Sequence, residues 1–320
     1  MTTALCFLLN VVQAAVAADV PKSMTEEWLD TTRNRTVPIR LFLPGNKEQT
    51  EKCPVMLLSH GLGGSRNGFD YLGEHWSQHG YVVVVMQHPG SDDSIWRNRQ
   101  SGETVQQAMG RGVTAQNALL RVGDVKFILD ELEKRNQKSS GSVLAERLDL
   151  TRIGIGGHSF GSQTTLAVVG KTAQTREPRL KVAVAMSPSP GNNFLPGVTF
   201  RNITIPALFL TGTDDNSPLD PNLKPADRLI PFREATGKDQ YLAVFDKGNH
   251  MLFSGHHRPL GKSILEQRYQ PLIQEITLNF LQAHLRDDDK AKQWLLGKGF
   301  DELMQGNGSI ERRKDEKLQH

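Results

Sequence analysis

The stretch that most constrains this chain is Gly-His-Ser-Phe-Gly at residues 157–161, which follows an alternating apolar run at residues 153–156. Small residues continue to about Gly170 and favour a closely packed helix. A serine with a glycine two positions before it and another two positions after it, at a sharp turn from strand to helix, is held in a strained geometry with its hydroxyl exposed. The pattern therefore predicts that Ser159 is a nucleophile, although a strand-to-helix turn with no catalytic role could have the same sequence.

Short apolar runs alternate with segments of helical spacing along the rest of the chain. The expected strands cover residues 37–43, 55–58, 81–86, 180–186, 205–210 and 241–245, and the expected helices 69–79, 113–136, 225–236 and 264–285. This order predicts an α/β fold in one domain, with a mostly parallel central sheet and helices on both faces. Ligands of such sheets bind beyond the carboxyl ends of the strands.

Composition excludes some classes of partner. The 320 residues are 38% hydrophobic and 23% charged, which is ordinary for a globular protein. The formal net charge is +3, without the clustered lysines and arginines that a nucleic-acid surface needs. We therefore expect no nucleic-acid partner.

The N-terminal residues read as a targeting segment. Residues 4–17 are nearly all apolar, too short for a typical membrane-spanning helix, and end in Ala-Val-Ala before Ala18. We expect residues 1–17 to be a signal peptide, so that the mature protein is exported, periplasmic or secreted, with no stable membrane span. No lysine or arginine precedes the apolar run, which leaves a buried N-terminal helix or a membrane anchor as alternatives.

The expected catalytic domain covers residues 18–290, and residues 291–320 are expected to form a C-terminal helix and a charged tail that frays from Ile310. The chain has two cysteines, and Cys6 falls in the expected signal peptide. Cys53 would then be alone, and its place before an apolar strand favours a structural thiol over a reactive one.

A serine nucleophile needs a base to remove its proton and an acid to orient that base. The chain order of nucleophile, acid and base is met by Ser159, Asp215 and His250, the last two directly after later strands. Asp214 is an alternative acid, and His256 or His257 an alternative base.

The developing oxyanion needs two backbone donors. Phe160, directly after the nucleophile, supplies one, and Leu62 in the Gly-rich turn at residues 60–64 is our choice for the second. Such a turn could instead hold a phosphate, but the lysine of a phosphate-binding loop is missing.

Other candidate residues concern the substrate. The polar segment 91–112 is expected to be irregular and to form either a lid or a surface insertion, with Trp96 and Met251 as candidate substrate contacts. The adjacent histidines at 256 and 257 lack partner ligands at metal-binding spacing, so no metal is expected. The sequence leaves the oligomeric state open.

Taken together, these motifs resemble a known family. Residues 60–63 and 157–161 are similar to the platelet-activating-factor acetylhydrolase-like branch of the α/β-hydrolases, which includes bacterial proteins described as predicted dienelactone hydrolases. Residues 212–218 and 250–255 look like the bacterial members, and the resemblance covers about residues 35–285. It implies the α/β-hydrolase fold, a serine esterase acting on short acyl chains, and no cofactor. Ser159, His250, Leu62 and Phe160 match the family's functional positions.

Two departures limit what the resemblance implies. Dienelactone hydrolases use a cysteine where this chain has Ser159. The animal phospholipid enzymes carry the acid after the strand that ends here at Met186-Ser187-Pro188, where no carboxylate stands.

The expected function is hydrolysis of small-molecule or lipid esters with short acyl groups. Alternatives are a polyester or bulky plant-ester hydrolase, a peptidase or acyltransferase using the same triad, and a binding protein with a silent site.

Overall fold

The computed structural model describes residues 22–45, 51–170, 174–190, 199–255 and 261–313. Within them one nine-stranded sheet has the order β1-β2-β4-β3-β5-β6-β7-β8-β9. The strands are β1 (Lys22–Asp30), β2 (Arg35–Leu43), β3 (Cys53–Ser59), β4 (Val82–Met86), β5 (Leu148–His158), β6 (Leu180–Met186), β7 (Ala207–Asp214), β8 (Gln240–Asn249) and β9 (Gly308–Arg313).

The centre of the sheet, from β4 to β8, is parallel, and antiparallel strands flank it on both sides. Every residue of β3 and β4 is buried, as expected for strands covered on both faces. The predicted α/β fold with a mostly parallel sheet is confirmed.

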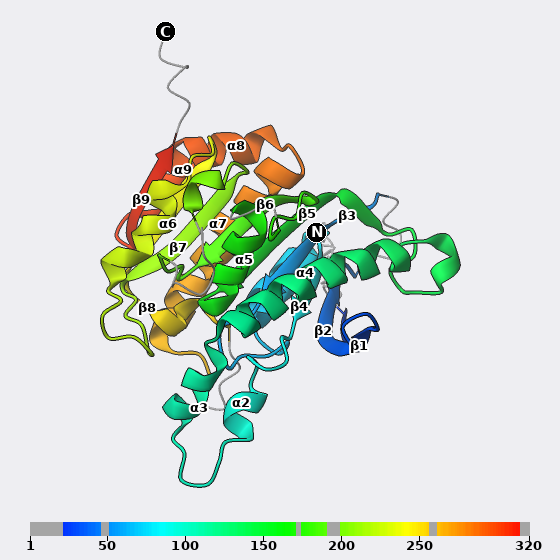
Figure 1. Ribbon diagram of the computed structural model, residues 1–320. Coiled ribbons are helices and arrows are strands. Elements are labelled where there is room, and N and C mark those ends of the chain that lie inside the picture. Colours follow the sequence, from blue (N-terminus) through cyan, green and yellow to red (C-terminus); the bar gives the residue numbers. More distant parts are fainter. Residues whose placement is uncertain (1–21, 46–50, 171–173, 191–198, 256–260, 314–320) are drawn as a thin grey trace, which may run out of the picture.

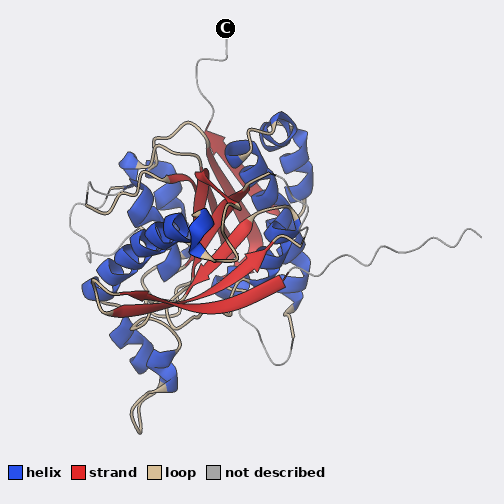
Figure 2. Cartoon of the chain, turned by 90° about the vertical axis from the view of Figure 1, so that its right-hand side faces the viewer, coloured by secondary structure: helices blue, strands red, loops and turns tan. Residues whose placement is uncertain are grey.

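Helices cover both faces of this sheet (Figures 1 and 2). They include α1 (Asp70–Gln78), α4 (Ala115–Arg135), α5 (Phe160–Gly170), α7 (Ile264–Leu285), α8 (Asp289–Leu296) and α9 (Lys298–Met304). One apolar core includes side chains of α4 and α5, and the other includes side chains of α1, α7, α8 and α9. The bounds of α7 equal the range predicted from the apolar spacing.

The first two strands pair with each other, although β1 has no counterpart among the expected strands. Strands β1 and β2 form an antiparallel hairpin in which Trp28 faces Val37, and both side chains are buried. The turn between them ends at Asn34, which has a φ of 47°, a conformation that asparagine tolerates better than most residues. The hairpin extends the sheet beyond β4.

The segment 91–112, expected to be irregular, contains two short helices, α2 (Ser94–Arg97) and α3 (Val105–Gly112). Helix α3 starts with a capping box in which Thr104 and Gln107 satisfy each other's backbone amides. Polar caps of this kind hold a helix whose apolar face is small, which explains why apolar periodicity did not reveal it. Figure 1 shows both helices projecting from one end of the body.

The C-terminal segment also differs from expectation. Residues 308–313 form β9 and pair antiparallel with β8, although the charged tail was predicted to fray from Ile310. Ile310 packs against the apolar core, while Arg312 bonds to the carbonyl of Leu295 and to Asp301. An edge strand needs only one apolar face, and its charges discourage pairing with another chain. Residues 314–320 lie outside the described part.

The expected signal peptide, residues 1–17, also lies outside the described residues. In the part that the structure describes, no helix combines the length and the apolar character that crossing a membrane requires.

The docking of β9 on β8 makes a testable prediction about two glycines. Gly308 and Gly306 both have positive φ, 151° and 70°, but only at Gly308 would a Cβ overlap backbone, namely the carbonyl of Val244. We expect Gly306→Ala to cost about 1 kcal/mol of unfolding free energy through backbone strain. Gly308→Ala should cost about 2 kcal/mol more through overpacking. Urea unfolding measures both, and equal losses would contradict the observed docking.

Candidate active site

Ser159 lies at the sharp turn between β5 and α5, with its backbone in the left-handed region at a φ of 55°. Its N–H donates to the carbonyl of Met186 at 2.9 Å, which ties the turn to β6. A Cβ on Gly161 would overlap the carbonyl of Ser59, and one on Gly157 would overlap the carbonyl of Gly161. The two glycines therefore allow the approach that leaves Ser159 half-exposed at the carboxyl end of β5.

His250 and Asp215 come to Ser159 from the ends of β8 and β7. The Nε2 of His250 is 2.9 Å from Ser159 Oγ, and its Nδ1 is 2.7 Å from Asp215 Oδ1. Asp215 is fully buried, whereas the neighbouring Asp214 is exposed. The structure therefore brings together Ser159, His250 and Asp215, and leaves Asp214 outside the cluster. His256 and His257 lie outside the described residues.

The carboxyl of Asp215 is held in its ionised form. Burial alone would raise its pKa, but the hydrogen bond from His250 and the charge of Arg228 bring the pKa below its usual value. Thr211 Oγ1 donates to the second carboxylate oxygen at 2.8 Å. An ionised acid accepts from Nδ1–H, which leaves Nε2 of His250 free to accept the hydroxyl proton of Ser159.

The Gly-rich turn after β3 lies beside the nucleophile. A Cβ on Gly61 would stand 3.4 Å from the Cβ of Ser159. The N–H groups of Gly63 and Gly64 are bonded to the carbonyls of Ser91 and Gly61. Leu62 lies between Gly61 and Gly63 at this turn and lines the same two clefts as Ser159.

The side chain of His60 fixes the orientation of this turn. The backbone N–H of His88 can only donate, so His60 Nε2, at 3.0 Å, is the unprotonated ring nitrogen. Nδ1 therefore carries the proton and donates to the Gly61 carbonyl at 2.6 Å. Since carbonyl and N–H point in opposite directions across a trans peptide, this bond directs the N–H of Leu62 away from His60.

The second expected donor, Phe160, is the first residue of α5. The N–H groups in the first turn of a helix have no acceptor within the helix, and the positive end of the helix dipole lies there. The Phe160 ring is buried beneath the guanidinium of Arg121, whose Cζ is 4.5 Å from the ring centroid. Arg121 Nη2 also donates to the His60 carbonyl at 2.5 Å. One buried side chain thus contacts both segments expected to hold an oxyanion.

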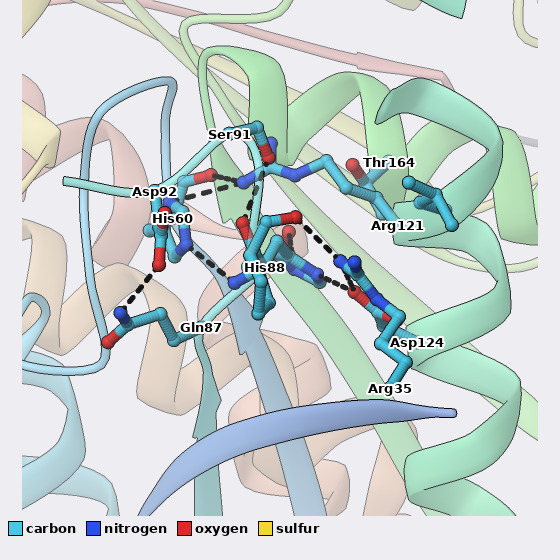
Figure 3. A network of polar contacts seen from close by, with 12 residues as sticks. Arg35, His60, Gln87, His88, Ser91, Asp92, Arg121, Asp124 and Thr164 are labelled. Carbon is cyan, nitrogen blue, oxygen red and sulfur yellow. Dashed lines mark hydrogen bonds and ion pairs between the residues drawn. The ribbon is translucent and has the colours of Figure 1, made fainter. Parts of the chain in front are cut away.

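A buried polar network supports Arg121 and His60 (Figure 3). His88 donates from Nδ1 to Asp124 at 3.0 Å and accepts at Nε2 from the Ser59 hydroxyl at 2.9 Å. Arg35 adds two bonds to the carboxylate of Asp124 and one to the carbonyl of Pro89. Burial alone would raise the pKa of Asp124, but the hydrogen bonds from His88 and Arg35 hold it well below its usual range.

Two clefts meet at the serine. The larger, of about 930 Å³, is lined by Trp96 and Met251 among others, and the smaller, of about 310 Å³, by Phe160 and Gln163. Leu62, Ser159 and His250 line both clefts. Trp96 Nε1 donates to the carbonyl of Gly63 at 2.8 Å, so the segment 91–112 is bonded to the Gly-rich turn.

The sequence analysis missed Arg121, Asp124 and Arg228, because the residue type alone does not distinguish a buried charged side chain in a helix from an exposed one. Arg228 lies in a short 3-10 helix, η3 (Pro225–Leu229), and contacts both Asp215 and His250. The signal that could have drawn attention to Arg121 and Asp124 is their place on the apolar side of α4. Among the described residues, no three His, Cys, Asp or Glu side chains come together in a way that would hold a metal ion.

The comparisons with known proteins agree with this fold. A family model for the alpha/beta hydrolase fold matches residues 54–211. A ferulic acid esterase from Streptomyces cinnamoneus has a similar structure, with a TM-score of 0.61 and 20% identity over 86% of this chain and 93% of that one. The chain therefore has the α/β-hydrolase fold.

The resemblance to platelet-activating-factor acetylhydrolases is confirmed. The protein of that name from Cavia porcellus is 24% identical over 281 residues, which cover 76% of this chain and 60% of the relative. Cutinase est1 from Thermobifida alba is 24% identical over 55% of this chain and 48% of its own length. The chain thus spans about 60% or less of the length of these relatives.

The buried histidine makes stability depend on pH. Burial and the charge of Arg121 lower the pKa of His88 to about 4, against the opposing effect of Asp124. The unfolded chain, with a histidine pKa of about 6.5, binds more protons between these values, so stability is complete above about pH 6.5 and falls as pH drops toward 4. We expect a loss of up to about 3 kcal/mol over this window, measured by urea unfolding.

The control for this prediction is His88→Gln, which should flatten the slope between pH 6.5 and 4. Burial also lowers the pKa of His75 to about 4, so a smaller slope of the same sign should remain. A slope unchanged in His88→Gln would contradict the assignment to His88.

Proposed function

We propose that this protein is a serine carboxylic-ester hydrolase that works through Ser159, His250 and Asp215. The observation that carries the proposal is the pair of distances at His250, 2.9 Å to Ser159 Oγ and 2.7 Å to Asp215 Oδ1. A catalytic base must lie within hydrogen-bond reach of the proton it removes and be oriented by a third group, and both requirements are met.

In this proposal Ser159 Oγ attacks the ester carbonyl while His250 Nε2 takes the hydroxyl proton. The N–H groups of Leu62 and Phe160 stabilise the negative oxygen of the tetrahedral intermediate. His250 then donates its proton to the departing alcohol, which leaves an acyl group on Ser159. A water molecule, deprotonated by His250, attacks this acyl-enzyme and releases the acid.

We propose short-acyl esters, lipid esters among them, as the substrate class. The similarity to platelet-activating-factor acetylhydrolases supports it, as does the unequal size of the two clefts, about 310 and 930 Å³. A small cleft beside Phe160 suits a short acyl group, and the larger cleft leaves room for a bulky alcohol, with Trp96 and Met251 at its wall.

A second candidate is a hydrolase of polyesters or bulky plant esters. The size of the larger cleft favours it, and so do the names of the cutinase relative and of the ferulic acid esterase with the similar fold. The two candidates differ in the size of the acid that the enzyme accepts.

The triad and the substrate class are tested with p-nitrophenyl esters from acetyl to dodecanoyl and with methyl ferulate. We expect kcat/KM to be highest for short acyl groups. Ser159→Ala and Asp215→Asn should each lose on the order of 10⁴-fold or more in kcat. Asp214→Asn is the matched control, since this neighbouring carboxylate is exposed and should leave kcat within about 2-fold of the wild type.

Several outcomes would change the reading. A preference for ferulate or long chains would favour the second candidate. Full activity in Ser159→Ala would contradict the proposed nucleophile. Absent hydrolysis in the wild type, together with no labelling by a fluorophosphonate, would indicate a silent binding protein.

We also propose that the enzyme is exported and that residues 1–17 are removed. The apolar run and the small residues before Ala18 support this. A chain of this length needs no disulfide to be stable outside the cell. Intact-mass analysis of the protein recovered from the exported fraction should give a chain that begins near Ala18. A chain that begins at Met1 in that fraction would contradict cleavage.

A further inference from the structure

We propose that Arg228 is a positioning residue that shares the Asp215 carboxylate with His250 and keeps the imidazole neutral, and so able to act as a base, at lower pH than the Asp–His pair alone would allow. This inference rests on the proposed function, because it concerns the base of the same reaction.

The guanidinium of Arg228 is held in one place. The residue is 2% exposed. Its Nε donates to the backbone carbonyl of Asp215 at 3.1 Å and lies 3.2 Å from the carboxylate Oδ1. Its Nη1 donates to the carbonyls of Ser187 and Pro188 at 3.2 and 3.3 Å. These acceptors follow β6 and β7, so the arginine joins the ends of two neighbouring strands beside the triad.

The contact with His250 is of a different kind. Arg228 Nη2 lies 3.2 Å from His250 Nδ1, but Nδ1 carries the proton that Asp215 accepts. An arginine has no acceptor, so two donors face each other and no hydrogen bond forms. Once His250 takes a second proton at Nε2, a full positive charge stands beside the guanidinium.

That arrangement disfavours the protonated imidazole in two ways. The two like charges repel directly in a site with little water. In addition, Arg228 partly neutralises the negative charge of Asp215. Without Arg228, the whole of that charge would stabilise the protonated imidazole. Both effects make His250 harder to protonate, so the neutral base persists to lower pH.

Few other charged or titratable groups face this imidazole in the described part of the chain. The ring of His158 has its centroid 4.8 Å away, and its Nε2 donates to the His250 carbonyl at 2.7 Å. Ser159 faces Nε2. Asp227 acts on Arg228: burial lowers the pKa of the guanidinium, and Asp215 and Asp227 oppose that shift. Arginine stays charged throughout the working pH range.

The kinetic test is the pH profile of kcat/KM for p-nitrophenyl acetate, whose acid limb reports protonation of the base in the free enzyme. We expect Arg228→Met to move the acid limb to higher pH by about one unit. Arg228→Lys, which keeps the charge, should lie close to the wild type. Arg233→Met is the control for charge, because Arg233 lies exposed on the neighbouring helix α6 (Ile230–Glu234).

A merely structural role would lower activity by the same factor at every pH and leave the limb in place, which would overturn the proposal. Arg228→Gln replaces the methionine variant if that variant does not fold, since its amide can still donate to the carbonyls of Ser187 and Pro188.

A direct test needs no activity. The ring carbons of His250 can be followed by NMR in protein labelled with ¹³C-histidine, with the signal assigned from His250→Gln. The midpoint of the His250 titration should rise by about one unit in Arg228→Met. Equal midpoints in both proteins would refute the inference even if esters are hydrolysed, whereas a shifted midpoint in a protein that hydrolyses no ester would refute only the proposed function.

Discussion

The close approach of α5 to the end of β3 is the contact on which the site depends. Gly161 lies against the Ser59 carbonyl at a distance that no side chain would permit. This contact brings the turn at Ser159 beside the Gly-rich turn at Gly61 and places the first N–H groups of α5 next to both. These segments are more than ninety residues apart in sequence, so the packing of two backbones brings them together, and the side chains of His60 and Arg121 then hold them in place.

Several charged side chains are buried behind the site, where they contact one another and the backbone. Asp124 accepts from His88, Arg33 and Arg35, while Arg121 reaches the His60 carbonyl and the Phe160 ring. Removing one member of such a network strongly destabilises the folded protein, because the charge of its former partner stays buried without compensation. Rigid support of this kind keeps backbone donors in place without reorganisation during a reaction.

Much of this arrangement could be predicted from the sequence, because strand ends and turn glycines are local signals. Ser159, Asp215 and His250 each follow an apolar strand directly, and parallel strands bring such ends to one edge. Strand β9 and Arg228 could not be predicted in this way. The first depends on an edge partner far away in the chain, and the second on burial of a residue type that is usually exposed. Helix α3 was missed because a polar cap, rather than apolar periodicity, marks its start, and helix α2 was missed because its four residues are too few to show a period.

The position of β9 has a consequence for how the molecule is made. Strand β8 carries His250 at its carboxyl end, and it is paired on one side by β7 and on the other by β9. During synthesis β8 keeps an open edge until residues 308–313 have left the ribosome. Domains generally fold as units as they emerge, and an unpaired strand edge invites association with other chains. The last strand of the described chain thus closes the sheet beside the histidine, and until it emerges that edge of β8 is open to pairing with other chains.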